Sequence, residues 1–527
     1  MPSSSPRRLL CESLLALVFA VVLTSCGGGG GSAGTIVGPA PGAPVEGPAW
    51  RGFASNAQHT ALGAVATQDL NRIAWSTPVD LAPPFQASGA LLIHYGSPVV
   101  TSHNTVVVPV KTGLAGGFRV EARSGSNGGL IWSADSDYVL PASRWVPSYN
   151  VALTTGNRLF APGSGGKLLV KDDADSASGA LRSLVFFGAN VYSASAAAFD
   201  TTVFINTPLT VDTQGNVFFG FVVTGANPAG LVSGIARIGA DGVGSWIPAA
   251  TAAADPAIEK VAMNSAPALS PDEATLYVAV NTSVIAATVQ TGFLLALDAR
   301  TLAVKARARL DDPTFAAPAQ VSDDGTSSPT VGPDGDVYFG VLEANFGTHN
   351  GRGWLLHFSA TLAPSAVPGG FGWDDTASIV PAAMVPSYSG SSSYLLMTKY
   401  NNYDGIGSGD GANRVAVIDP HASQTDGVSG LLIMKEVLTV LGATFESGTS
   451  GPVRGWCINT AAVDPLTRSI LVNSEDGFLY RWDLATNRLT QKIRLTGGLG
   501  EAYTPTAIGA DGAVYAVNDA TLFSVAK

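Results

Sequence analysis

The chain has 527 residues, of which 46% are hydrophobic and only 13% charged, and its formal net charge at pH 7 is -11. An acidic chain without runs of Lys or Arg is not suited to binding nucleic acid, nor to docking by charge on anionic lipid. By length alone about 480 residues after a leader would suggest three domains, but a repeat architecture would make them one unit.

The first 25 residues have the pattern of a secretory signal peptide. A short start carrying Arg7 and Arg8 precedes an almost wholly apolar stretch over residues 9–23, which is too short to span a bilayer comfortably. Leu23-Thr24-Ser25-Cys26 resembles the bacterial lipobox, which implies cleavage before Cys26 and acylation of that cysteine. Gly27 occupies the place where inner-membrane retention usually needs Asp, so the resemblance implies the cell outer membrane, on its periplasmic or its surface face. The alternative is an ordinary cleaved signal peptide with a coincidental cysteine.

Residues 26–49 are almost all Gly, Ala, Pro, Ser and Val, so we expect a flexible linker after the lipidated Cys26. Folded sequence is expected to begin near Trp50 and to run to residue 527. Cys11 leaves with the signal peptide, so Cys457 has no partner for an intramolecular disulfide. For Cys457 a buried, inert thiol is favoured over a nucleophile.

The rest of the chain repeats a short strand that begins with Ser/Thr-Pro or a close relative, a turn rich in Asp, Gly and Pro, and a strand of β-branched and aromatic residues. Units start at Ser97, Ser148, Thr207, Ala266, Ser328, Pro381, Asn459 and Thr504. Asp-Gly and Pro-Asp-Gly turns are typical of hairpins, because Gly adopts positive φ. Eight units spaced roughly 45 to 65 residues apart predict an all-β fold, a single β-propeller with four-stranded blades.

The last unit determines how the ring closes. After Val514–Val517 and Leu522–Val525 the chain ends one strand short of a full blade, and Ile73–Asp80 is an unassigned strand before the first unit. An N-terminal strand completing the C-terminal blade would remove an exposed sheet edge. We therefore expect eight blades closed in this way, with seven blades as the alternative.

Several motifs resemble the quinoprotein-like propellers, also called pyrroloquinoline-quinone-like repeats. The motifs are Trp50-Arg51-Gly52-Phe53, Asn56-Ala57-Gln58-His59-Thr60, Ile73-Ala74-Trp75, Gly128-Gly129-Leu130-Ile131-Trp132, Ala296-Leu297-Asp298-Ala299-Arg300-Thr301 and Arg481-Trp482-Asp483-Leu484-Ala485-Thr486. This group includes quinone-dependent alcohol dehydrogenases and the propeller lipoprotein of the outer-membrane protein assembly machine. The resemblance implies a propeller over residues 50–527.

Membership of the enzymes would imply an adjacent cysteine pair over the quinone and a calcium-coordinating carboxylate beside a catalytic Asp. The chain has no adjacent cysteine pair and no stretch that reproduces that carboxylate setting. Gly-x-Ser-x-Gly, His-Glu-x-x-His and Walker motifs are also absent from the sequence. The sequence therefore predicts no catalytic residues; no cofactor is expected apart from a possible calcium ion, and pyrroloquinoline quinone is disfavoured. The acidic pair Asp374-Asp375 is expected in a turn or solvated loop.

One Gly-rich loop, residues 401–413, offers hard oxygen ligands for calcium. Its candidate ligands are Asp404, Asp410 and Asn413, on a backbone free to wrap a cation. The alternative is a long hairpin whose Asp and Asn side chains serve turns.

Long loops between second and third strands are expected on the face where the chain enters the innermost strands. Arginines and aromatic residues precede those strands: His94, Tyr95, Arg144, Trp145, Arg454, Trp456 and Tyr503. These residue types dominate contact energies, so we expect a surface for an envelope protein or a glycan. The alternative is that the tryptophans pack between blades and the arginines hold loops.

The resulting interpretation is a non-catalytic propeller lipoprotein, anchored in the outer membrane, that binds a partner or ligand through its loop-rich face. Two alternatives stay open at this point. One is a quinone-dependent dehydrogenase-like enzyme, and the other is a surface glycan-binding module.

Overall fold

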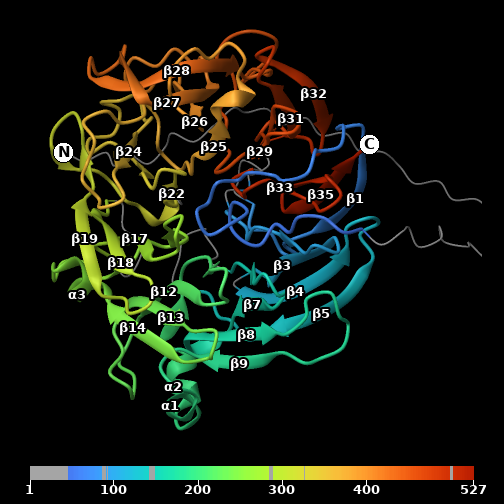
Figure 1. Ribbon diagram of the computed structural model, residues 1–527, viewed down its shortest axis with the longest axis vertical. Coiled ribbons are helices and arrows are strands. Elements are labelled where there is room, and N and C mark those ends of the chain that lie inside the picture. Colours follow the sequence, from blue (N-terminus) through green and yellow to red (C-terminus); the bar gives the residue numbers. More distant parts are fainter. Residues whose placement is uncertain are drawn as a thin grey trace, which may run out of the picture.

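The computed structural model describes residues 45–85, 91, 93–114, 116–141, 149–283, 289–325, 327–498 and 502–527. Within them, eight antiparallel sheets follow one another around a central axis in chain order (Figure 1). The protein is a single eight-bladed β-propeller, as the spacing of the repeats predicts, and the seven-bladed alternative is wrong.

Blades 1 to 4 cover the first half of the ring. Their strands are β2 (Val99–Val100), β3 (Thr105–Gly113), β4 (Gly116–Ser124) and β5 (Leu130–Ser136) in blade 1; β6 (Ala152–Leu153), β7 (Leu159–Pro162), β8 (Lys167–Lys171) and β9 (Arg182–Val185) in blade 2; β10 (Val203–Ile205), β11 (Thr210–Val211), β12 (Val217–Val223), β13 (Gly234–Ile238) and β14 (Gly244–Pro248) in blade 3; and β15 (Lys260–Val261), β16 (Ala268–Leu269), β17 (Thr275–Asn281), β18 (Gly292–Asp298) and β19 (Val304–Arg309) in blade 4. Short helices lie between them: α1 (Ala189–Ser193), α2 (Ala196–Asp200), α3 (Ala249–Ala253) and the 3-10 turn η1 (Ser164–Gly166).

Blades 5 to 8 complete the ring. Their strands are β22 (Thr330–Val331), β23 (Val337–Val341) and β24 (Trp354–Phe358) in blade 5; β25 (Ser378–Pro381), β26 (Tyr394–Tyr400), β27 (Arg414–Thr425) and β28 (Leu432–Leu441) in blade 6; β29 (Ala462–Asp464), β30 (Ser469–Asn473), β31 (Phe478–Asp483) and β32 (Arg488–Arg494) in blade 7; and β33 (Ala507–Ile508), β34 (Val514–Asn518), β35 (Thr521–Ala526) and β1 (Arg72–Pro78) in blade 8. A two-stranded ribbon, β20 (Asp311–Asp312) with β21 (Ala317–Pro318), precedes blade 5, and the 3-10 turns are η2 (Asp323–Gly325) and η3 (Ala382–Met384).

The ring closes through the N-terminal strand, as predicted. Strand β1 pairs antiparallel with β35, from Arg72 opposite Ala526 to Pro78 opposite Thr521, and the order in blade 8 is β1-β35-β34-β33. In Figure 1 the blue β1 accordingly lies beside the red C-terminal strands. This pairing covers an edge that β35 would otherwise expose.

The segment before β1 crosses the ring at the end of the innermost strands, an arrangement that the sequence did not suggest. It accepts backbone hydrogen bonds from five of the eight blades, through Arg51 O to Leu153 N, Ala57 O to Leu269 N, Gln58 O to Val331 N, Thr60 O to Ile379 N and Ala61 O to Val463 N. Trp50 also forms an isolated bridge with Val100 of blade 1. This end of the central channel is therefore occupied by the chain itself.

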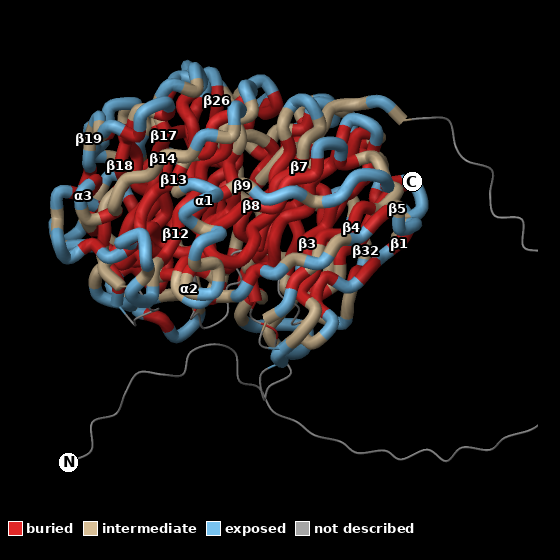
Figure 2. The backbone as a smooth tube through the Cα atoms, turned by 90° about the horizontal axis from the view of Figure 1, so that it is seen from below, coloured by how far each residue is buried: buried red, intermediate tan, exposed pale blue. Residues whose placement is uncertain are grey.

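Seen edge-on, buried residues occupy the interior of the disc, whereas exposed residues lie mainly in the turns on its two faces and at its rim (Figure 2). The core lies between neighbouring blades, where the large aromatic side chains of Trp354, Trp456 and Trp482 are fully buried. Within the described ranges, no helix has the length and apolar character needed to span a membrane.

Candidate functional site

The segment before β1 covers one end of the central axis. At the other end, the chain enters each innermost strand. Backbone and small polar side chains tie neighbouring entries together: Ser97 N to Asn150 Oδ1, Asn264 N to Asn206 O, Ala266 N to Ser328 Oγ, Ser328 N to Thr376 Oγ1, Thr376 N to Asn459 O, Thr506 N to Thr460 O and Thr504 Oγ1 to Tyr95 O. These bonds join seven of the eight pairs of adjacent blades, so the entries form a fixed collar around the axis.

Ionisable side chains from four blades meet inside this collar, and we call this group the axial site. Its members are His94, Asp374, Asp375, Lys399, Cys457, Glu475 and Tyr503. His94 belongs to the entry of blade 1, and Asp374 to that of blade 6, yet His94 Nδ1 lies 3.9 Å from Asp374 Oδ1. Blades 7 and 8 separate these two blades in the ring, so the contact crosses the axis.

Lys399, at the end of β26, holds Asp374 in place. Its Nζ donates a 2.6 Å hydrogen bond to the Asp374 backbone oxygen and lies 3.7 Å from the carboxylate Oδ2. Asp374 has a φ of +53°, a left-handed conformation that is uncommon outside Gly and Asn. Burial lowers the pKa of His94 well below its usual range, and the nearby Lys399 charge lowers it further, so His94 is neutral.

Two further carboxyl groups at this site ionise with difficulty. Burial raises the pKa of Asp375 to about 6, although Lys399 and a hydrogen bond from Thr398 oppose the shift. Burial likewise raises the pKa of Glu475 to about 7, against a hydrogen bond with Cys457. The pKa of the Cys457 thiol is raised well above its ordinary value by burial and then by Glu475. Titratable groups perturbed in this way are typical of functional sites.

Flat rings line the site. The imidazole of His94 stacks on the Tyr503 ring, with centroids 4.1 Å apart and an interplanar angle of 7°. Cys457 and Glu475 are partly exposed, so a ligand would approach the cluster from their side.

Several oxygen atoms near the axis lack a hydrogen-bond donor. Asn206 Oδ1 and Asn264 Oδ1, at the entries of blades 3 and 4, are buried and have no partner among the described residues. Unpaired buried acceptors of this kind carry a desolvation cost. Together with three carboxyl groups, they make the axis rich in hard oxygen ligands, the type that calcium and similar cations prefer.

The structure brings together two of the residues singled out from the sequence, His94 and Tyr503. Among the described residues the others have contacts of their own, although the charge of Arg454 also lowers the pKa of Glu475. Tyr95 donates a hydrogen bond to Asp80, Trp456 is fully buried against Tyr480, and Arg454 contacts the Glu446 backbone oxygen. Arg144 and Trp145 lie outside the described residues, as does the lipidation residue Cys26.

The proposed calcium loop places its oxygen atoms in local hydrogen bonds. Asp410 Oδ1 accepts from Asn402 Nδ2 and Ala412 N, and Asn413 Oδ1 accepts from Asn402 N. Asp404 is exposed. Calcium binding by this loop stays a prediction.

Asp374, Asp375, Lys399 and Glu475 are site residues that the sequence reading missed. The expectation that Asp374-Asp375 is a solvated turn is wrong, because both side chains are buried where four blade entries converge. An acidic pair directly before a predicted innermost strand is the local signal that could have identified them.

No protein-family model matches the sequence, and no curated protein matches it either. The fold, in contrast, matches many solved structures. A europium-containing methanol dehydrogenase is similar with a TM-score of 0.51 at 12% identity, over 89% of each chain. The quinohemoprotein alcohol dehydrogenase from Comamonas testosteroni is similar with a TM-score of 0.52 at 13% identity, over 90% of this chain and 80% of that one. At such identities the likeness shows a shared β-propeller fold alone.

These likenesses correct two expectations. Both solved propellers are dehydrogenases, so the comparison favours the enzyme alternative over a non-catalytic binding propeller. One is named for a quinone and the other for a metal, which also counts against the expectation that this chain uses no pyrroloquinoline quinone. The lack of an adjacent cysteine pair does not exclude an axial site, because that site is formed where the blade entries converge.

Proposed function

We propose that this protein is an oxidoreductase of the quinone-dependent dehydrogenase type, with its reaction centre at the axial site. The observation that carries the proposal is the meeting of His94, Asp374 and Lys399 across the axis of a dehydrogenase-like propeller. The fold alone does not determine function, so the proposal depends on these side chains.

The axis offers the carboxyl groups of Asp374, Asp375 and Glu475 and the ammonium of Lys399 to a bound quinone. Among the described residues these three carboxyl groups do not gather closely enough to form a metal cluster by themselves, so a hard cation would need ligand atoms from the quinone as well. The Lys399 ammonium, held by the Asp374 backbone oxygen, is a donor for a quinone carbonyl. When bound, such a quinone would accept the two electrons removed from an alcohol.

The remaining residues give the site its selectivity. Neutral His94 is held flat against Tyr503, so this wall is rigid and offers no charge to a substrate. Asp375 and Glu475 are carboxyl groups whose pKa values lie near neutral pH, which suits a group that takes a proton from a hydroxyl. The lone Cys457 replaces the cysteine pair of the known enzymes, so the cover over the quinone would differ from theirs.

The proposal also includes export of the protein and its anchoring to a membrane through lipid attached to Cys26. A lipid tether would place the reaction in the cell envelope, where an external electron acceptor is required because nothing in this chain resembles a second redox group.

The test is reconstitution of the purified protein with pyrroloquinoline quinone and either Ca²⁺ or a lanthanide. We expect the quinone to stay bound through gel filtration and an artificial acceptor dye to be reduced when primary alcohols are added. Asp374→Asn and Lys399→Gln should each abolish most quinone retention. Matched controls are Asp298→Asn and Lys305→Gln, since that pair has the same 3.7 Å separation but lies exposed on blade 4. Failure of the wild type to retain quinone with any of these cations, or equal retention by Asp374→Asn, would overturn the proposal.

A further inference from the structure

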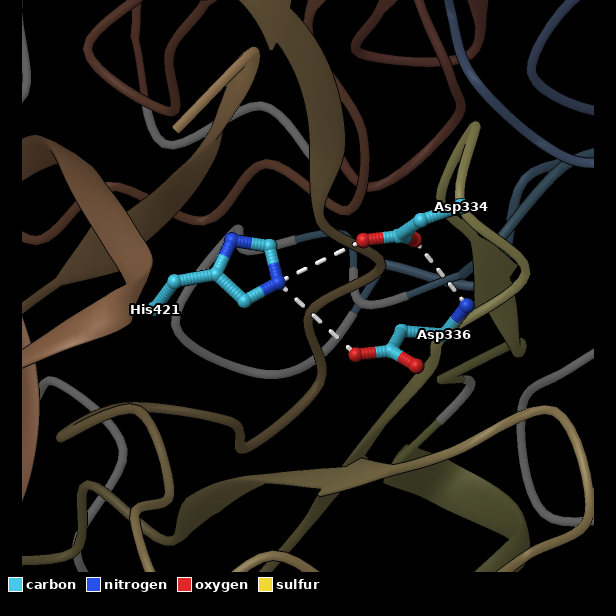
Figure 3. Close-up of side chains that lie close together, drawn as sticks. All are labelled: Asp334, Asp336 and His421. Atoms are coloured by element: carbon cyan, nitrogen blue, oxygen red, sulfur yellow. Dashed lines mark hydrogen bonds and ion pairs between the residues drawn. The ribbon is translucent and has the colours of Figure 1, made fainter. Parts of the chain in front are cut away.

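A second cluster of metal-binding side chain types lies far from the axial site, between blades 5 and 6. Asp334 and Asp336 belong to the turn between β22 and β23, and His421 belongs to β27. This turn follows the end of the innermost strand β22, so it lies on the face opposite the axial site. Figure 3 shows that the two carboxylates and the imidazole point toward a common centre.

The distances suit a tetrahedral cation. His421 Nε2 lies 3.3 Å from Asp334 Oδ2 and 3.8 Å from Asp336 Oδ2, and one ligand atom of each residue lies within 4.8 Å of the others. A tetrahedral zinc ion with bonds of about 2.0–2.1 Å separates its ligand atoms by roughly 3.3 Å. Small side-chain movements would therefore bring all three atoms into coordination.

Each of the three side chains is oriented by a neighbour outside the cluster. The Tyr394 hydroxyl donates to both oxygens of Asp334, at 2.9 and 3.0 Å. Asp336 Oδ2 contacts His357 Nε2 at 2.7 Å. His421 Nδ1 contacts Ser392 Oγ at 3.3 Å, and Ser392 donates in turn to Asp419. Such outer partners are characteristic of metal ligands, because they fix the tautomer and direction of the coordinating atoms.

His357 supplies an observation independent of the acidic turn. Its side chain is only 8% exposed and stacks on Tyr338, and its Nδ1 has no hydrogen-bond partner within the described residues. A histidine held against Asp336 at such depth is not a solvated surface residue. It provides a second imidazole at the wall of the cluster.

The charge at this place is not balanced by Lys or Arg. Some buried carboxylates elsewhere are neutralised by ammonium groups, as Asp80 is by Lys111, whereas others, such as Asp312 and Glu343, accept hydrogen bonds from backbone N–H groups. In the described part of the chain, the ion pairs of Asp334 and Asp336 are with histidines. Two carboxylates that lack a fixed positive partner and remain 39% and 24% exposed attract a cation and leave it a way in.

We propose that Asp334, Asp336 and His421 form a site for a divalent transition metal, with His357 and Ser392 as positioning residues. Mixed imidazole and carboxylate ligands favour zinc-like ions over calcium, which takes oxygen ligands alone. A metal here joins the turn of blade 5 to strand β27 of blade 6, so its role is to fasten two blades on the face away from the axial site.

The test uses the full-length protein after treatment with a chelator, with Zn²⁺ as the probe. Competition with a chromogenic chelator should show one tightly bound equivalent that His421→Ala and Asp334→Asn both remove. Ser392→Ala keeps all three ligands and should weaken binding by about 10- to 100-fold, the usual effect of losing an outer partner. Zn²⁺ should raise the melting temperature of the wild type and not that of His421→Ala.

The matched control is His103→Ala. His103 Nδ1 lies 2.8 Å from Asp175 and its Nε2 lies 4.0 Å from Glu46, so it is also a histidine between two carboxylates, but it is exposed. Asp374→Asn, which alters the axial site, should keep the zinc equivalent. The proposal is overturned if the wild type binds no zinc, if His421→Ala retains the equivalent, or if His103→Ala loses it. The melting temperature of each metal-free variant shows that it is folded before binding is compared.

Discussion

The indole Nε1 of Trp75 donates a 2.7 Å hydrogen bond to the backbone oxygen of Gly125, which links the outermost strand of blade 8 to the turn between β4 and β5 of blade 1. The ring therefore closes twice, once within blade 8 by strand pairing and once between blades 8 and 1 by this side chain. Trp75 is 8% exposed, and its ring also packs on Tyr515 at 5.7 Å.

Replacing Trp75 should weaken this closure in two separable steps. Trp75→Phe keeps an aromatic ring but leaves the Gly125 oxygen with only the longer 3.4 Å hydrogen bond from the Tyr515 hydroxyl, which should cost about 0.5–1.5 kcal/mol of unfolding free energy. Trp75→Ala also leaves a cavity and should cost about 3–5 kcal/mol. Chemical denaturation of both variants measures the contribution of the hydrogen bond and that of ring packing separately. Equal losses for Phe and Ala would show that the hydrogen bond, and not the packing, provides the closure.

The buried pair Lys260 and Asp323 predicts a strong dependence of each residue on its partner. Lys260 Nζ lies 2.6 Å from Asp323 Oδ1, and both side chains are at most 3% exposed. Asp323→Asn leaves a buried ammonium without its counter-charge and should cost about 3–5 kcal/mol. The double variant Lys260→Met/Asp323→Asn should recover most of that loss, because the Asn oxygen can still accept the hydrogen bonds from Met263 N and Asn281 Nδ2. For the exposed pair Lys305 and Asp298, the corresponding loss should stay below about 1 kcal/mol. A double variant no more stable than Asp323→Asn would contradict the electrostatic explanation.

His59 predicts a pH dependence of stability. Burial lowers its pKa from 6.5 to about 4 in the folded protein, against a hydrogen bond with the Pro329 oxygen, so the unfolded chain takes up a proton first as the pH falls. The stabilising effect of neutral His59 is complete above pH 6.5 and is lost as the pH falls toward 4, by at most about 3 kcal/mol.

His59→Asn should flatten the stability profile between pH 6.5 and 4, since Asn does not titrate there and tolerates the φ of +59° at this position. His103 is a control of opposite sign, because its hydrogen bond with Asp175 raises its pKa. His103→Asn should therefore leave the acid loss of stability in place. An unchanged profile in His59→Asn would assign the acid sensitivity to other groups.

The lipobox predicts that Cys26 carries the membrane anchor. Cys26→Ser should leave the protein without acyl chains and move it from the membrane to the soluble fraction, because each buried methylene contributes roughly 0.8 kcal/mol to anchoring. Metabolic labelling with a fatty-acid analogue checks this, and Cys457→Ser serves as the control. Equal labelling of wild type and Cys26→Ser would end the anchor interpretation.

The blades could be predicted because each is marked locally. A Ser/Thr-Pro pair begins an innermost strand for a structural reason visible in blade 3, where Thr207 Oγ1 accepts a hydrogen bond from Gly220 N of the adjacent strand. The missing strand of blade 8 was likewise visible as an unpaired one near Ile73. The repeated strand-and-turn pattern and its spacing along the chain are therefore enough to predict the fold.

The axial site could be predicted only in part. His94 and Tyr503 were identified by residue type and by their place before innermost strands. Asp374 and Asp375 have the local sequence of a surface turn, and what buries them is the approach of chain segments far apart in the sequence. The raised pKa of Glu475 similarly comes from its burial in the closed ring, against the hydrogen bond with Cys457 from a different loop. Such environments are properties of the closed ring.

The N-terminal segment has a consequence for the way the molecule holds together. Because Arg51, Gln58 and Ala61 bond to blades on different sides of the axis, this segment joins blades that do not touch one another. A single proteolytic nick in a loop between two blades would therefore cut the chain without opening the circle. The two fragments would stay together because β1 pairs with β35 at the outer edge of blade 8 and residues 51–61 hydrogen-bond to innermost strands near the axis. The cut protein would then resemble a circularly permuted one, in which the chain ends lie at a new place in an unchanged ring.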